Sequence, residues 1–215
     1  MRVNVERKTL ESRMTVFVDD GARDPEGKKK LSTPLSFFNH MLEQLVWRSE
    51  LNIGVEVELD HFFLNHVVCE DTGIALGKAF RELMLKKQEA GAPGYGFALS
   101  TIDEALARAV VSFESRAYLD LNFNGIQVPE NTEGIQCEDL ISFWEGFVQG
   151  AMCTIHLDLL KARANHGHHQ WESMFRAVGQ AMCQAFQIRE WRKNMAAGVA
   201  GKIDYQIRIE DGELN

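Results

Sequence analysis

Apolar residues along the chain change between the two-residue period of a strand and the longer period of a helix. Residues 51–59 alternate strictly, which predicts a half-buried strand, and residues 2–18 alternate in the same way. Residues 21–33 form a Gly, Pro and Lys loop. Residues 36–48 and 66–87 have apolar residues at helical spacing. The first part of the chain therefore predicts strands before and between two helices.

The second part of the chain repeats this order after a Gly-Ala-Pro-Gly break at residues 91–94. Strands are predicted at 96–101, 110–113, 118–123 and 152–159, and helices at 137–149 and 168–187. The pattern predicts an α+β protein with duplicated β-β-α-β-α half-domains whose sheets are covered by helices on one face. We expect a first half-domain at 1–92, a second at 93–202 and a C-terminal tail at 203–215.

The two helices that end the predicted halves carry the same pair of polar residues. His66 and Glu70 recur at matched positions as His168 and Glu172, within a longer run of matching Ala and Gly residues. A His and a Glu four residues apart lie on one helical face and suit a divalent cation. His169 points about 100° away from its neighbour, so it would serve a different cation. One such pair is often only a polar helix face, but duplication favours a metal site.

Composition narrows the class of protein. The chain has 215 residues, of which 45% are hydrophobic and 25% charged, with a formal net charge of −8. Without a basic block, nucleic acid is not an expected partner. No stretch reaches the roughly 18 apolar residues of a membrane span, and the four cysteines show no disulfide or metal spacing. We expect a cytoplasmic protein with no membrane partner.

Four segments in order, namely 37–45 (FFNHMLEQL), 70–77 (EDTGIALG), 103–107 (DEALA) and 168–172 (HHQWE), resemble the imidazoleglycerol-phosphate dehydratase family of histidine biosynthesis. The resemblance covers nearly the whole chain. It implies a ribosomal protein S5 domain 2-like fold and a homo-oligomer of 24 subunits built from trimers. It also implies paired Mn²⁺ ions at subunit interfaces and dehydration of a small phosphorylated imidazole substrate without a redox cofactor.

The family pattern that the resemblance implies has eight metal ligands, and this chain departs from it at two. Val67 stands where a second His follows His66, and Ser142 stands where a His belongs on an earlier helix. We expect an intact site of His40, His66, Glu70 and, from a neighbouring subunit, His169. A depleted site would keep only His168 and Glu172, so that about one Mn²⁺ or other divalent cation binds per subunit. His166, His61 or Cys69 could be recruited to the depleted site instead.

The resemblance also implies substrate-handling residues. Glu11, Gln44 and Asp103 match catalytic positions, and Arg116, Arg176 and Lys202 match phosphate-binding positions. Each of the three catalytic candidates has a structural alternative: Gln44 could cap a helix, and Asp103 with Glu104 could open one.

Three hypotheses follow for function. The first is a metal-dependent hydro-lyase, a carbon-oxygen lyase that has diverged in substrate and keeps one intact metal site. The second is a genuine imidazoleglycerol-phosphate dehydratase of histidine biosynthesis. The third is a non-catalytic relative in which the metal only holds the subunits of the oligomer together.

Overall fold

The structure, a computed structural model, describes residues 1–60, 63–201, 203 and 206. His61, Lys202 and most of the 203–215 tail therefore lie outside the described residues. Within the described ranges, none of the helices combines the length and the apolar character needed to cross a bilayer.

The first sheet comes from the N-terminal part of the chain. Its strands, in spatial order, are β1 (Arg2–Lys8), β2 (Ser12–Asp19), β4 (Asn52–Leu59) and β3 (Leu31–Ser32). The alternating segment 2–18 is thus a hairpin of two strands rather than one strand. The chain reverses at residues 9–11, where the Thr9 amide donates to the Ser12 carbonyl. Alternation persists across such a turn, so it does not mark the reversal.

The second sheet repeats this order, with a longer parallel edge strand. Its strands are β5 (Tyr95–Ile102), β6 (Ala105–Ser112), β10 (Thr154–Lys161) and β7 (Tyr118–Asn122). In both sheets the short edge strand, β3 or β7, runs parallel to its neighbour and the other pairs are antiparallel. A small hairpin of β8 (Asn131–Thr132) and β9 (Ile135–Gln136) precedes the third helix. The predicted α+β class is confirmed, although each sheet has four strands rather than the three of a β-β-α-β-α half-domain.

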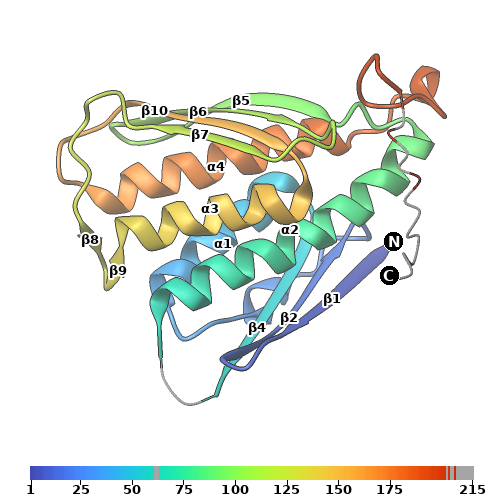
Figure 1. The fold of residues 1–215 in the computed structure, drawn as a ribbon. Coiled ribbons are helices and arrows are strands. Elements are labelled where there is room, and N and C mark those ends of the chain that lie inside the picture. The colour runs from blue at the N-terminus through green and yellow to red at the C-terminus, as the bar shows by residue number, and fades with distance from the viewer. Residues whose placement is uncertain (61–62, 202, 204–205, 207–215) are drawn as a thin grey trace, which may run out of the picture.

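In the described part of the chain, four α-helices lie between the two sheets (Figure 1). They are α1 (Ser36–Ser49), α2 (Asn65–Ala90), α3 (Cys137–Ala151) and α4 (Gly167–Phe186), and two short 3₁₀ turns, η1 (Gly27–Lys30) and η2 (Glu190–Arg192), lie in connections. The helices pair across the repeat, because α1 packs on α4 and α2 packs on α3. This pairing decides which predicted metal ligands meet.

Glycines set the approach of α2 to α3. A Cβ atom at Gly146 would lie 2.5 Å from the Glu70 carbonyl oxygen, and one at Gly150 would lie 2.2 Å from the Ile74 carbonyl oxygen. The backbones therefore touch without side chains between them. Both contacts advance by four residues along each helix, so the two helices run parallel. Continued back by one turn, the same register places Ser142 beside His66.

The core fills the space between the helices with aromatic side chains. Phe38 and Phe143 meet edge to face with ring centroids 5.1 Å apart, and Phe80 meets Phe147 at 5.2 Å. All four are fully buried. Burial of each contributes roughly 1.5–3 kcal/mol. The helices are thereby held as a rigid frame for the polar side chains at their ends.

Candidate metal centre

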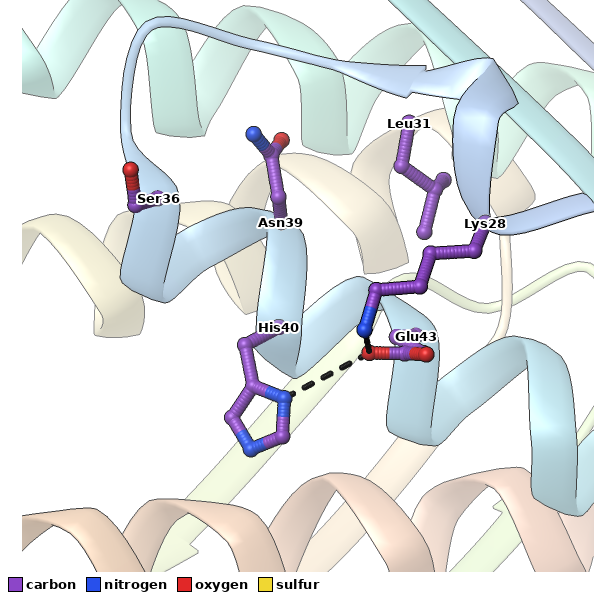
Figure 2. Close-up of a pocket in the computed structure, with 6 residues that line it drawn as sticks. All are labelled: Lys28, Leu31, Ser36, Asn39, His40 and Glu43. Atoms are coloured by element: carbon purple, nitrogen blue, oxygen red, sulfur yellow. Dashed lines mark ion pairs between the residues drawn. The ribbon is translucent and has the colours of Figure 1, made fainter.

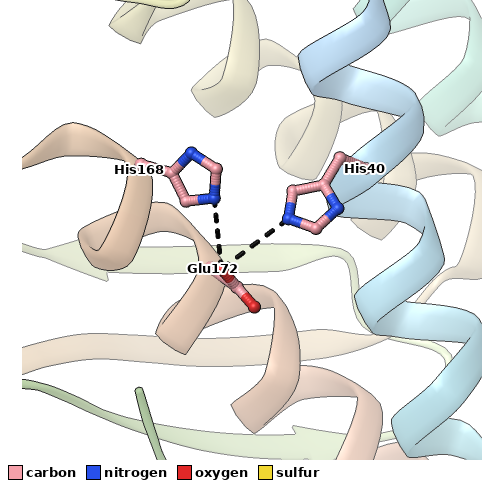
Figure 3. A group of neighbouring side chains, drawn as sticks. All are labelled: His40, His168 and Glu172. Carbon is pink, nitrogen blue, oxygen red and sulfur yellow. Dashed lines mark ion pairs between the residues drawn. The ribbon is translucent and has the colours of Figure 1, made fainter. Parts of the chain in front are cut away.

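Three side chains from two helices converge beside the start of α4. His40 projects from α1, while His168 and Glu172 lie one turn apart on α4 (Figure 3). The Glu172 Oε2 atom lies 3.3 Å from His168 Nε2 and 3.7 Å from His40 Nε2. One ligand atom from each residue falls within 4.8 Å of the other two. Two imidazole nitrogens and a carboxylate oxygen at this spacing suit a divalent cation.

Glu172 is the buried member of this group, with only 3% of its surface exposed. Its second oxygen, Oε1, accepts a hydrogen bond from the Arg176 guanidinium, one turn along α4. Arg176 also donates to Gln44 Oε1 at 2.9 Å and to the Thr101 carbonyl at 3.1 Å. The guanidinium neutralises one side of the carboxylate and holds it in place. Oε2 faces the two imidazoles.

Outer carboxylates hold the far side of both imidazole rings. Glu133 Oε1 lies 2.5 Å from His168 Nδ1, and Glu43 Oε2 lies 3.5 Å from His40 Nδ1. An ionised carboxylate only accepts hydrogen bonds, so His168 donates from Nδ1 to Glu133 and leaves Nε2 facing Glu172, whereas Glu43 is a more distant ion-pair partner of His40. Metal-binding histidines in proteins are commonly oriented in this way. Both Nε2 atoms lie on the side of Glu172.

A pocket adjoins His40 on its outer side. It has a volume of about 320 Å³ and is lined by Lys28, Leu31, Ser36, Asn39, His40 and Glu43 (Figure 2). The Lys28 ammonium lies 3.2 Å from Glu43 Oε2, which also faces His40. The pocket therefore offers an ammonium group and polar side chains beside the imidazole of a candidate metal ligand.

The grouping of ligands differs from the one expected from the sequence. His40 lies with His168 and Glu172, not with His66 and Glu70. The reason is the pairing of the helices: α1, which carries His40, packs on α4. The set on α2 consists of His66 and Glu70, whose Nε2 and Oε2 atoms are 3.4 Å apart. Among the described residues, no third ligand joins that pair within one chain.

A second group of potential ligands lies next to the first. Glu104, in the turn between β5 and β6, accepts hydrogen bonds from the Nδ1 atoms of both His166 and His169. The bond from His166, followed by a backbone bond and that from His169, lowers the pKa of the Glu104 carboxyl to about 2. His169 therefore meets Glu104 and His166 within its own chain.

Glu11, Asp103 and Arg116 belong to neither group, although Asp103 directly precedes Glu104. Glu11 and Asp103 lie in exposed hairpin turns, with Asp103 in the left-handed region at a φ of 43°. Arg116 is exposed in the loop after β6. Cys69 is fully buried, and burial raises the pKa of its thiol, which disfavours the thiolate that a metal needs.

Sequence reasoning missed Glu43, Glu133 and the metal-ligating potential of Glu104. Glu43 stands three residues after His40, a spacing that brings side chains together on a helix and could have identified it. Glu133 precedes Gly134 in the β8–β9 turn, where Asn or Asp is the usual residue. The presence of Glu133 at such a turn position could have pointed to a role for its carboxylate.

Comparison with known proteins gives the family. The family model for imidazoleglycerol-phosphate dehydratase matches residues 33–182. The imidazoleglycerol-phosphate dehydratase of Pseudomonas paraeruginosa is 32% identical over 189 residues, covering 88% of this chain and 91% of the relative. That of Azotobacter vinelandii is 36% identical over 186 residues, covering 85% and 88%.

Solved structures agree with the sequence comparisons. The crystal structure of the Pyrococcus furiosus imidazoleglycerol-phosphate dehydratase superposes with a TM-score of 0.75 at 25% identity, covering 92% of this chain and 99% of the other. The Staphylococcus aureus enzyme gives a TM-score of 0.71 at 26% identity, covering 88% and 100%. The chain belongs to the imidazoleglycerol-phosphate dehydratase family.

Proposed function

We propose that this protein dehydrates imidazoleglycerol phosphate in histidine biosynthesis and that a divalent cation, Mn²⁺ in the first instance, binds at His40, His168 and Glu172. The observation that carries the proposal is the convergence of these three side chains on one point from α1 and α4. The buried Glu172 carboxylate turns one oxygen to Arg176 and the other to two imidazoles. That arrangement fits a cation and would leave coordination positions open.

The residues around the site have separate tasks. Glu133 orients His168, Glu43 lies beside His40, and Arg176 fixes Glu172. A bound cation supplies electrostatic stabilisation of negative charge on an imidazole ring and so favours loss of water from the attached carbon. The pocket beside His40 supplies the Lys28 ammonium, which suits a phosphate group.

This proposal favours a genuine dehydratase over the diverged lyase expected from the sequence. The divergence hypothesis depended on both substitutions falling on one site. In the structure, His40 joins His168 and Glu172, which we call the α4 set. Ser142 then removes a ligand from the α2 set of His66 and Glu70. Val67 still removes a ligand from the α4 set, as the resemblance implies. Each set then keeps three of its four ligands once His169 of a neighbouring subunit is counted. The long matches to dehydratases support the same choice.

We retain the expectation of a homo-oligomer of 24 subunits, as members of the family form oligomers. Exposed apolar side chains on the second sheet support assembly: Tyr95, Phe97 and Leu99 follow the edge strand β5, Tyr118 lies on the opposite edge strand β7, and each is at least half exposed. Such a surface is unusual on a protein that stays a monomer. Arg116 and Lys202 remain proposed phosphate contacts, and Glu11 and Asp103 remain proposed catalytic residues.

Complementation of a histidine auxotroph tests the proposal. The wild-type gene is expected to restore growth without histidine, and His40→Ala and Glu172→Gln are expected to fail while still producing folded protein. His156→Ala is a matched control, because His156 is an exposed histidine paired with Asp120 on the outer sheet. Failure of the wild-type gene, with loss of assembly on chelation, would favour a metal-stapled oligomer instead.

A further inference from the structure

A buried carboxylate on α2 joins this helix to the first hairpin of the chain. Asp71 directly follows Glu70 in α2, and 8% of its side chain is exposed. Its Oδ2 atom accepts hydrogen bonds from Arg7 Nη1 at 2.5 Å and from Ser12 Oγ at 2.7 Å. Arg7 lies near the end of β1 and Ser12 begins β2, so the two donors stand on either side of the turn at residues 9–11. One carboxylate oxygen therefore holds both strands where the chain reverses.

The 9–11 turn is also fixed through its backbone. Thr9 Oγ1 accepts hydrogen bonds from the Glu11 and Ser12 amides, both at 3.1 Å. The Glu11 carbonyl accepts another from the Asp60 amide at 3.1 Å. The side chains at the tip are nonetheless exposed, Leu10 to 94% and Glu11 with it. A turn held this closely presents Glu11, a proposed catalytic residue, at a defined place on the surface.

The internal repeat shows that packing a helix on the sheet does not require this ion pair. The residue of the second copy that corresponds to Asp71 is Ser173, which donates to a carbonyl of its own helix. In the second copy α4 is joined to β5 by another side chain, because Arg176 donates to the Thr101 carbonyl at 3.1 Å. Thr101 lies two residues before Asp103, the other proposed catalytic residue on a turn. Each copy thus fixes an exposed turn to the helix that carries candidate metal ligands, and the two copies do so with different groups.

The energetics of a buried ion pair point to a role in geometry. Such a pair adds little net stability over well-packed apolar residues, because both groups lose their hydration. It does add direction, since charge-assisted hydrogen bonds form only within narrow ranges of distance and angle. Apolar side chains in place of Arg7 and Asp71 would pack the helix on the sheet without fixing the turn.

We propose that Asp71 is a positioning residue for the dehydration: by holding the 9–11 turn on α2, it keeps Glu11 at a fixed place relative to the His66 and Glu70 pair. The inference rests on the proposed function, in which Glu11 acts on the substrate. Misplacement of a reacting group by about 1 Å can lower a rate by roughly 100-fold. Loss of the Asp71 contacts is therefore expected to lower kcat, while KM and the content of Mn²⁺ stay close to those of the wild type.

The test combines Asp71→Asn with Glu11→Gln in the Mn²⁺-loaded oligomer. We expect Asp71→Asn to lower kcat for imidazoleglycerol phosphate by about 10–100-fold. In the Glu11→Gln background the same change is expected to lower kcat by less than about threefold, because the effects of residues that act as a unit are not additive. Asp20→Asn is the matched control, since it breaks the ion pair between Asp20 and Lys87 of α2, 2.5 Å apart, at the open end of the same hairpin. The control is expected to keep the wild-type kcat.

A milder variant and a second measurement accompany the kinetics. Ser12→Ala removes one donor to Asp71 while the ion pair with Arg7 remains, so it is expected to fold. We expect it to lower kcat less than Asp71→Asn does, and to have little effect in the Glu11→Gln background. Hydrogen exchange of the Thr9 and Glu11 amides is expected to quicken by about tenfold or more in Asp71→Asn and to stay unchanged in Asp20→Asn.

Three results would each overturn the inference. They are equal kcat in Asp71→Asn and Asp20→Asn, an equal loss of kcat from Asp71→Asn in both Glu11 backgrounds, and unchanged exchange of the turn amides in Asp71→Asn. Failure of the proposed function looks different, because the metal-loaded wild type itself would then show no turnover. The role of Asp71 in dehydration would fail with it, and the exchange measurement would still decide whether Asp71 holds the turn.

Discussion

Replacement of Glu133 by Asn separates the stability of the β8–β9 hairpin from the orientation of His168. Glu133 and Gly134 are the two central residues of the turn, with φ values of 51° and 90°. A left-handed conformation costs a residue with a side chain roughly 1–2 kcal/mol, and Asn tolerates it far better than Glu. Loss of the contact to His168 costs only about 0–1 kcal/mol, because Glu133 is 54% exposed. Glu133→Asn is therefore expected to be as stable as the wild type or more so.

Metal affinity is expected to change in the opposite direction. Asn cannot reach His168 Nδ1 as Glu does, so the ring loses the carboxylate that keeps Nε2 aimed at Glu172. Loss of such an outer partner typically lowers metal affinity by about 10–100-fold. Calorimetric titration of the metal-free protein with Mn²⁺ measures this, alongside thermal unfolding. Glu130→Asn removes an exposed charge from the same loop as a control. Unchanged affinity in folded Glu133→Asn would refute the positioning role.

Three further predictions follow from the packing and the charges. Gly77→Ala is expected to lower the free energy of unfolding by about 1–3 kcal/mol, measured by denaturant titration, because the new Cβ would lie 2.3 Å from a backbone oxygen of α3; an unchanged midpoint would contradict the close approach. Arg176→Met is expected to destabilise the metal-free protein by roughly 3–5 kcal/mol, because the buried Glu172 carboxylate loses its guanidinium partner. Mn²⁺ is expected to restore much of this stability. An equal loss of stability with and without Mn²⁺ would argue against a metal ion at Glu172. Because the pKa of Glu104 is lowered to about 2 from 4.5, its contribution to stability is present above pH 4.5 and lost as the pH falls toward 2; carboxyl NMR titration checks this, and a midpoint near 4.5 would contradict it.

The repeat pattern predicted the α+β class and most helices because each helix has a long amphipathic face. The segment 2–18 was predicted as one strand, since alternation continues through the reversal at residues 9–11 and no Gly or Pro marks it. The short strand β3 was predicted as part of a loop, because two residues carry no periodicity.

The candidate ligands were identified from the sequence, but their grouping was not. Spacing within a helix places His66 with Glu70 and His168 with Glu172, as the structure has them. Which helix brings His40 depends on the packing of α1, and that is set by tertiary contacts such as the close approach at Gly179, where a Cβ would lie 2.7 Å from that of Arg48. Local patterns contain no information on that choice.

The most direct test of the account is the rate at which the purified protein dehydrates imidazoleglycerol phosphate before chelation, after chelation and after return of Mn²⁺. We predict turnover that disappears with the metal, returns with Mn²⁺ and is absent in His40→Ala. Turnover that persists in fully chelated protein, or no turnover in protein that has bound its metal, would contradict the account.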